Sequence, residues 1–179
     1  QHIELGIAEV NLVCLAAELG LTGARWGQPL IPIATLYDPF IGRALEPWTF
    51  GMYAGGRSIV IGTPSGVTLA PEGGAHQSIG TPSITLEIPH LTSWEPAFAQ
   101  DLEWTMLEAI RDVADPTGGS AYFRLSTRPV DQSLSRTPDD PLLRERRREE
   151  VLAGGYRLSA HPAAEDQVTL VGVGAIMTE

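Results

Sequence analysis

The chain has 179 residues, 43% of them hydrophobic and 19% charged, and its mean hydropathy is zero, so it can fold around a core. The formal net charge of −10 disfavours nucleic acid and anionic lipid as partners. All twelve basic residues are arginine, which excludes Schiff-base enzymes and Walker-type ATPases because both need lysine. The single cysteine, Cys14, excludes an internal disulfide. No run of 18 apolar residues occurs, so we expect a soluble, cytoplasmic protein.

Helices and strands are predicted to alternate along the chain. Long runs rich in alanine and leucine favour helices, and short β-branched runs favour strands. Asp38-Pro39 and Glu95-Pro96 are typical of helix starts. The expected elements are a helix at 3–21, a strand at 30–35, a helix at 39–53, a strand at 58–62, a loop rich in glycine and proline at 62–83, a strand at 83–88, a helix at 95–113 and a strand at 121–126. This order predicts an α/β fold with a parallel sheet.

The composition shifts toward proline, aspartate, serine and arginine after the last of these elements. The expected division is a domain at 1–128, an interdomain linker at 129–153 and the start of a second domain at 154–179. Arginine and glutamate alternate along 144–150, which is typical of a solvated helix face. Residues 168–173 predict a buried strand. Because Gln1 lies so close to the first predicted helix, we expect the chain to be a piece of a longer polypeptide.

Glu9 is the first candidate functional residue. On the predicted first helix it lies about 140° away from the polar stripe of Glu4, Asn11 and Glu18, on an apolar face. A carboxylate in apolar surroundings must find a partner or share a proton. A structural salt bridge with an arginine and an exposed position at the rim of the helix are the alternatives.

The long loop supplies a second candidate, His76. Glycines on both sides of Glu72 and His76 let the backbone approach a ligand closely, and histidine exchanges protons near neutral pH. The alternative is a loop histidine without a role. No spacing of histidines and carboxylates fits a metal site, so we predict none.

Two aromatic residues flank the junction between the strand at 30–35 and the helix that follows it. Tyr37 and Phe40 lie where ligands bind in α/β proteins, at the carboxyl end of a strand, and an aromatic ring there can stack on a flat heterocycle. Packing in the core is the alternative for both rings.

Six segments, taken in order, resemble one known family. Residues 1–9 (QHIELGIAE) are similar to the segment that carries the catalytic glutamate of thiamine-diphosphate enzymes in the transketolase superfamily. Residues 32–40 (PIATLYDPF) resemble that family's aromatic segment beside the aminopyrimidine. Residues 62–66 (GTPSG) and 71–77 (PEGGAHQ) resemble its active-site loop. Residues 154–158 (GGYRL) and 168–174 (VTLVGVG) resemble the entry to its carboxy-terminal domain. The nearest resemblance is to the homodimeric type of pyruvate dehydrogenase decarboxylase component.

This resemblance implies a pyrimidine-type domain, incomplete at its N-terminus, followed by the first strands of a transketolase C-terminal-like domain. It implies that Glu9 hydrogen-bonds the aminopyrimidine of thiamine diphosphate and so activates the cofactor for attack on a 2-oxo acid. Phe40 would stack on the pyrimidine with Tyr37 beside it. His76 would face the substrate as a proton donor or positioning group.

The resemblance also implies partners. Ser65 and Glu72 are further substrate-binding candidates, and the substrate would be a 2-oxo acid such as pyruvate. The family's Gly-Asp-Gly motif, which holds magnesium and the diphosphate on a separate domain, does not occur here, so we expect this chain alone to be inactive. The resemblance implies three protein partners: a second copy of the chain in a homodimer, the diphosphate-binding domain and a lipoyl acyltransferase.

Two other functions stay open. Transketolases and deoxyxylulose-phosphate synthases transfer ketol groups and need basic residues for a sugar phosphate. Arg124 and Arg128 could serve, but Glu95 stands where an arginine before a proline would be expected, which favours the 2-oxo acid. The third alternative, a non-catalytic assembly domain, is disfavoured because Glu9, Phe40 and His76 occur together.

Overall fold

Four short strands in the described part of the chain form one parallel sheet. The computed structural model describes residues 1–68, 73–159 and 168–179. The strands are β1 (Ile33–Leu36), β2 (Ile59–Gly62), β3 (Leu91–Trp94) and β4 (Ser120–Arg124), and their order in the sheet is β1-β2-β4-β3. All neighbouring strands run parallel, which confirms the predicted α/β class.

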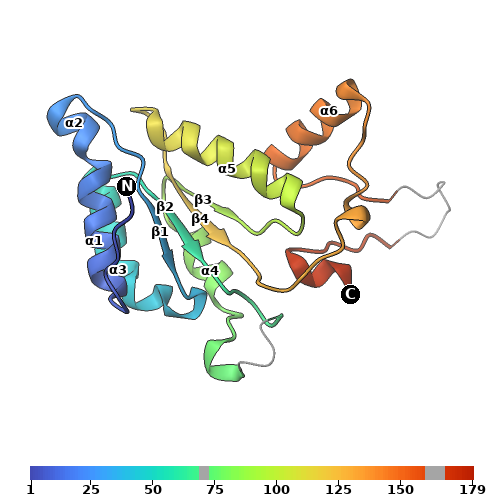
Figure 1. Cartoon of the computed structure of the whole chain (residues 1–179), viewed down its shortest axis with the longest axis horizontal. Coiled ribbons are helices and arrows are strands. Elements are labelled where there is room, and N and C mark those ends of the chain that lie inside the picture. The colour runs from blue at the N-terminus through green and yellow to red at the C-terminus, as the bar shows by residue number, and fades with distance from the viewer. Residues whose placement is uncertain (69–72, 160–167) are drawn as a thin grey trace.

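Helices cover both faces of the sheet (Figure 1). The α-helices are α1 (Glu9–Gly20), α2 (Thr22–Trp26), α3 (Ile41–Tyr53), α4 (Thr81–Leu86), α5 (Ala99–Ala114) and α6 (Pro141–Leu152). Short 3₁₀ turns lie at Asp38–Phe40, Gly74–His76, Gln132–Ser135 and Ala175–Thr178. In the described part of the chain, no helix is long and apolar enough to cross a membrane.

The core has two halves because side chains alternate across the strands. Val60 and Tyr122 face α1 and α3, where they pack with Trp48 in one buried cluster. Ile59 and Phe123, one residue earlier and one later, belong to a second cluster on the side of α5. Leu102, Met106, Ala109 and Val113 recur at helical spacing along α5 and all belong to that cluster.

The first helix is shorter than predicted. It begins at Glu9, not at residue 3, and residues 1–7 are exposed and form no helix. Gly6 adopts a φ of +66°, a conformation that a right-handed helix does not use. The apolar sequence of this segment suggests a helix that is buried nearly all round, but only Val13, Ala16 and Ala17 are buried on it.

The third predicted strand is a helix. Residues 83–88 fall largely within α4, which has Pro82 in its first turn, and the strand β3 lies further along the chain. The β-branched residues of α4 resemble a strand in pattern, but β3 holds the edge position beside β4. Helix α5 begins at Ala99 instead of residue 95, so Glu95 belongs to the turn that leaves β3.

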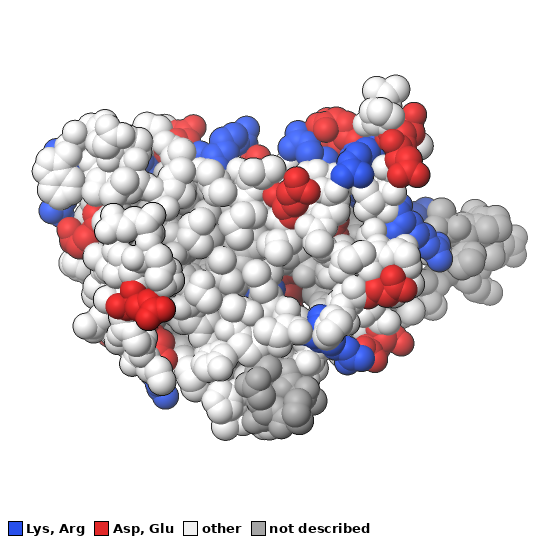
Figure 2. Space-filling model, in the orientation of Figure 1, with Lys and Arg blue, Asp and Glu red and all other residues white. Residues whose placement is uncertain are grey.

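The predicted linker contains helix α6. Asp140 caps its N-terminus by accepting from the Leu143 N–H, and the helix packs against α5. Arg148 and Arg146 pair with glutamates of the same helix, and Figure 2 shows these charges gathered at the α6 end of the molecule. The solvated helix face is therefore confirmed, while the division into two domains stays a prediction.

The strand predicted at residues 168–173 is wrong. The segment has no regular structure, and Val168 and Leu170 are 87% and 91% exposed. A β-branched run forms a strand only where a neighbouring strand supplies hydrogen bonds. The chain then returns to the body of the molecule at Gly174, where an added Cβ would lie 2.6 Å from Oε1 of Glu95.

Candidate active site at the carboxyl edge of the sheet

The candidate site lies where the parallel strands end. Asp38 follows β1, Ser65 follows β2, Glu95 follows β3, and Arg124 is the last residue of β4. Because the carboxyl ends of parallel strands meet at one edge, these side chains are brought together from segments far apart in sequence.

Three rings form what we call the ring cluster: Tyr37, Phe40 and His76. The ring centroids lie 6.0 Å (Tyr37 to Phe40), 5.7 Å (Tyr37 to His76) and 5.8 Å (Phe40 to His76) apart, with edge-to-face geometry. Tyr37 is 44% exposed, and Phe40 and His76 are half-buried. The fold therefore brings together the aromatic segment and the loop histidine that the sequence singled out separately.

Arg43 links Glu9 to the ring cluster. Its guanidinium carbon lies 4.5 Å from the Phe40 centroid, and its Nη1 lies 3.6 Å from Oε1 of Glu9. The Glu9 side chain is only 12% exposed, whereas that of Arg43 is 61% exposed. The salt bridge considered as an alternative is thus present, and it holds the shielded carboxylate beside the predicted rings.

One polar atom of the ring cluster has no hydrogen-bond partner among the described residues. Nδ1 of His76 is buried and makes no hydrogen bond to any of the described residues. A buried ring nitrogen is ordinarily hydrogen-bonded. This atom therefore has an unused capacity to donate or accept a hydrogen bond within the ring cluster.

A buried polar network adjoins the ring cluster, because its carboxylate belongs to Asp38, which lies between Tyr37 and Phe40 in the chain. The Asp38 network, as we name it, consists of Asp38, Ser78, Thr81, Tyr122 and Arg124. Oδ1 of the fully buried Asp38 accepts from the Tyr122 hydroxyl at 2.5 Å, and Oδ2 accepts from the Thr81 hydroxyl at 2.7 Å. The Ser78 hydroxyl and Arg124 Nε also donate to Oδ2, the latter at 3.2 Å. Four donors thus satisfy one buried carboxylate.

Burial and neighbouring charge perturb two acids at this edge. Burial, followed by the adjacent Asp38 charge, raises the pKa of Tyr122 far above its usual range, so its hydroxyl stays a donor. Burial also raises the pKa of Glu95, although Arg124 acts in the opposite direction. Gly62 leaves space for the network, because a Cβ there would lie 2.6 Å from Oδ1 of Asp38 and would overlap the Tyr122 hydroxyl.

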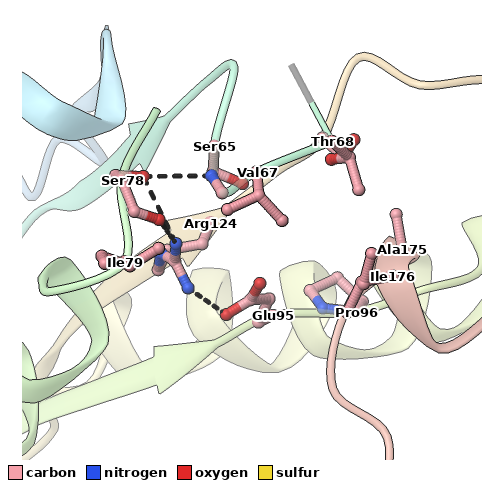
Figure 3. A pocket seen from close by; sticks show the side chains of 12 residues that line it. Ser65, Val67, Thr68, Ser78, Ile79, Glu95, Pro96, Arg124, Ala175 and Ile176 are labelled. Atoms are coloured by element: carbon pink, nitrogen blue, oxygen red, sulfur yellow. Dashed lines mark hydrogen bonds and ion pairs between the residues drawn. The ribbon is translucent and has the colours of Figure 1, made fainter. Parts of the chain in front are cut away.

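A pocket of about 190 Å³ opens beside this network (Figure 3). The predicted Ser65 lines it and is 3% exposed. Glu95 and Arg124 form an ion pair in its wall. The other predicted loop residue, Glu72, lies outside the described residues. Within the described ranges, no group of three or more histidine, cysteine, aspartate and glutamate side chains could hold a metal ion.

Sequence reasoning misses the Asp38 network. From the sequence, Asp38 is only a helix start and Arg124 only a possible phosphate ligand. One signal could have pointed to both: Arg124 interrupts an apolar strand, and Asp38 follows another at the same edge of the sheet. A charged pair at two strand ends is a candidate buried ion pair.

The chain is similar to curated proteins over nearly its whole length. It is 28% identical over 180 residues to the 6-deoxy-6-sulfo-D-fructose transketolase subunit of Clostridium sp. (strain MSTE9), covering 97% of this chain. It is 23% identical over 179 residues to the pyruvate dehydrogenase E1 component of Escherichia coli (strain K12), covering 99% of this chain. No protein-family model matches.

Solved structures show the same fold. The transketolase of Pichia stipitis superimposes with a TM-score of 0.60 at 18% identity over 74% of this chain, and that of Campylobacter jejuni with 0.60 at 18% over 73%. The curated relatives and this shared fold together confirm the resemblance to the transketolase superfamily.

The match covers only part of each relative from that superfamily. The chain spans 52% of the Clostridium subunit and 20% of the Escherichia coli component. It spans 18% and 19% of the two transketolase chains. A relative named as a transketolase subunit and one named as a pyruvate dehydrogenase component thus both align with nearly the whole of this chain.

Proposed function

We propose that the chain is the aminopyrimidine-binding part of a thiamine-diphosphate enzyme that decarboxylates a 2-oxo acid, as a pyruvate dehydrogenase (acetyl-transferring) component. The observation that carries the proposal is the convergence of Glu9, Tyr37, Phe40 and His76 at the carboxyl edge of the sheet. The similarity to a pyruvate dehydrogenase component over 99% of the chain supports it.

The residues of this edge fit a flat amino-heterocycle. Phe40 and Tyr37 present aromatic faces, and Nδ1 of His76 is a buried polar atom without a partner among the described residues. Arg43 stands between Phe40 and Glu9, but its side chain is 61% exposed, and solvent weakens an ion pair on the side of its exposed partner. A ligand ring can therefore displace Arg43 at little cost and reach the Glu9 carboxylate.

Each residue then has a distinct task. Glu9 holds or shares a proton at its carboxylate, where its low exposure excludes competing water. Phe40 stacks on the heterocycle with Tyr37 beside it, and His76 donates a proton to the substrate or positions it. When bound, thiamine diphosphate supplies an electron sink for the bonding electrons released as carbon dioxide leaves. Ser65 and Glu72 are proposed to contact the substrate.

The proposal includes partners that hold the rest of the cofactor. A diphosphate-binding domain of the same family would bind magnesium and the diphosphate, and the active enzyme would be a homodimer. A lipoyl acyltransferase would accept the acyl group. This chain alone is then expected to release no carbon dioxide from pyruvate when thiamine diphosphate and magnesium are added.

Thiamine binding by the purified protein tests the role of the ring cluster without any turnover. Saturation-transfer NMR detects weak binding, and Phe40→Ala is expected to weaken it at least about fivefold, because stacking of one base-like ring is worth about 1 to 3 kcal/mol. Glu9→Gln should weaken it as well, whereas Glu18→Gln, on the exposed side of α1, should not. Equal binding by wild type and Phe40→Ala would exclude the proposed site.

A catalytic role of Glu9 is tested in the assembled enzyme. Glu9→Gln should lower kcat about 100-fold or more, since proton transfer by a positioned group contributes about 10² to 10⁴. Circular dichroism should stay unchanged, and Glu18→Gln serves as the matched control. Full turnover by Glu9→Gln would instead indicate a non-catalytic assembly domain.

Ketol transfer is the second candidate function. The observation that favours it is the 28% identity to a protein named as a 6-deoxy-6-sulfo-D-fructose transketolase subunit. Assaying the assembled enzyme with pyruvate and, separately, with a ketose and an aldose acceptor separates the two. Carbon dioxide release with pyruvate supports the first function, and transfer of a two-carbon unit supports the second.

A further inference from the structure

The pocket at the sheet edge contains one ion pair whose two partners are unequally exposed. The Arg124 side chain is 6% exposed, while the Glu95 side chain keeps 23% exposure. Arg124 Nη1 donates to Oε2 of Glu95, and Figure 3 shows the two groups pointing toward each other in the pocket wall. The carboxylate is thus the more accessible half of the pair.

The other nitrogens of Arg124 are engaged inside the protein. Nε donates to Oδ2 of Asp38 at 3.2 Å, and Nη2 donates to the Ser78 carbonyl at 3.1 Å. Nη1 is therefore the nitrogen that remains for a ligand in the pocket, and one of its N–H groups already donates to Glu95.

The charges of this edge do not favour an anion. One guanidinium faces the two carboxylates of Asp38 and Glu95, so the negative formal charges outnumber the positive one. Glu95 and Arg124 are the only charged side chains among the described residues that line the pocket. A buried arginine would ordinarily bind a phosphate or carboxylate group, but here its charge is already compensated.

The rest of the lining is neutral. Ser65, Thr68 and Ser126 contribute hydroxyl groups, and Val67 and Ile176 contribute apolar surface. The volume of about 190 Å³ equals the liquid volume of about six water molecules. Such a lining suits a small molecule that has hydroxyl or carbonyl groups and carries no charge inside the pocket.

We propose that Glu95 closes an anion site in this pocket, because its carboxylate takes the place on Arg124 that a phosphate, sulfonate or carboxylate group would occupy. The pocket then selects small uncharged polar groups. Removing Glu95 converts it into an anion site.

If the proposed function holds, on which this step rests, the pocket selects among substrates by their charge. A sugar phosphate that entered the pocket with its phosphate group would meet the Glu95 carboxylate. A 2-oxo acid whose carboxylate lies outside the pocket would not. Glu95 would thus be a specificity-determining residue.

Inorganic sulfate is the probe, because it keeps both charges throughout the neutral pH range. We would titrate it into the purified wild type, Glu95→Ala and Glu95→Gln at pH 7 by isothermal titration calorimetry. Both Glu95 variants are expected to bind at least about tenfold more tightly than wild type, because juxtaposed like charges are costly. The matched control is Glu145→Ala, which removes the exposed partner of Arg148 and changes the net charge equally.

The gain in sulfate affinity of the Glu95 variants must also depend on Arg124. Adding Arg124→Gln to Glu95→Ala should abolish it in a protein that circular dichroism shows to be folded. If that double variant does not fold, protection of the Arg124 side-chain NMR signal by sulfate in Glu95→Gln decides in its place. No gain in either Glu95 variant, or an equal gain in Glu145→Ala, would overturn the proposal. Since no cofactor or turnover is involved, this outcome is independent of the thiamine-diphosphate function.

Discussion

The ring cluster and the Asp38 network share one edge of the sheet but differ in how completely they are satisfied. In the network, a fully buried carboxylate accepts from four side chains. In the ring cluster, Tyr37 is largely exposed and a buried nitrogen of His76 has no partner among the described residues. The network therefore holds the edge together, whereas the ring cluster keeps the capacity to bind a ligand.

The two regions are interleaved along the chain. Asp38 lies between Tyr37 and Phe40, and Ser78 comes two residues after His76. A hydrogen bond from Ser78 to Asp38 therefore fixes the histidine loop against the aromatic segment. Loss of a network residue should cost stability, and loss of a ring should cost binding.

The largest expected effect comes from Asp38→Ala. The substitution leaves Arg124 buried without one of its two carboxylate partners, and breaking a buried ion pair costs about 3 to 5 kcal/mol. Urea denaturation measures the free energy of unfolding. Asp139→Ala, at an exposed position, should change it by less than about 0.5 kcal/mol. Equal stability of the two variants would refute the structural role of the network.

Gly62→Ala should have the next largest effect. The new Cβ would collide with the Tyr122 hydroxyl and with Asp38, and overpacking of this kind costs about 1 to 3 kcal/mol. Gly42→Ala is the matched control, because nothing lies within 4 Å of the position that its new methyl group would take, and a helical alanine is favoured by about 0.5 to 1 kcal/mol. Thermal unfolding measures the stability of both variants against wild type. A Gly62→Ala protein as stable as wild type would contradict the prediction.

Two substitutions in one loop distinguish the role of the Asp38 network from that of the ring cluster. Ser78→Ala removes a donor from the buried carboxylate and should cost about 1 to 3 kcal/mol. His76→Ala, two residues earlier, should cost less than about 1 kcal/mol, because its ring is only half-buried and its Nδ1 makes no bond to the described residues. Chemical denaturation in parallel measures both. The reverse order would mean that the ring cluster, too, serves stability.

The smallest expected effect is a pH dependence at Glu95. Burial raises the pKa of its carboxyl in the folded protein above the ordinary value of 4.5, so the folded state holds this proton more tightly than the unfolded chain. The resulting contribution to stability is fully present below about pH 4.5 and declines as pH rises through the raised pKa. Glu95→Gln should remove that decline in a series of urea titrations. A variant with the wild-type pH profile would exclude Glu95 as its origin.

Much of the fold follows from local pattern. The helix at residues 39–53, the strand at residues 58–62 and the apolar face of α5 were predictable because each depends on capping, β-branching or a helical period within one segment. The error at residues 83–88 shows the limit, since β-branched residues form either element until a neighbouring strand is available.

The candidate site divides in the same way. Glu9, Tyr37, Phe40, Ser65 and His76 could be singled out from residue type and resemblance, because a carboxylate, a ring or a glycine-flanked histidine has recognisable chemistry by itself. Nothing local indicates that Asp38 bonds to Tyr122 or Arg124, which lie 84 and 86 residues away. Which charges neutralise one another depends on which strand ends are adjacent. The parallel pairing of the strands in the sheet decides that.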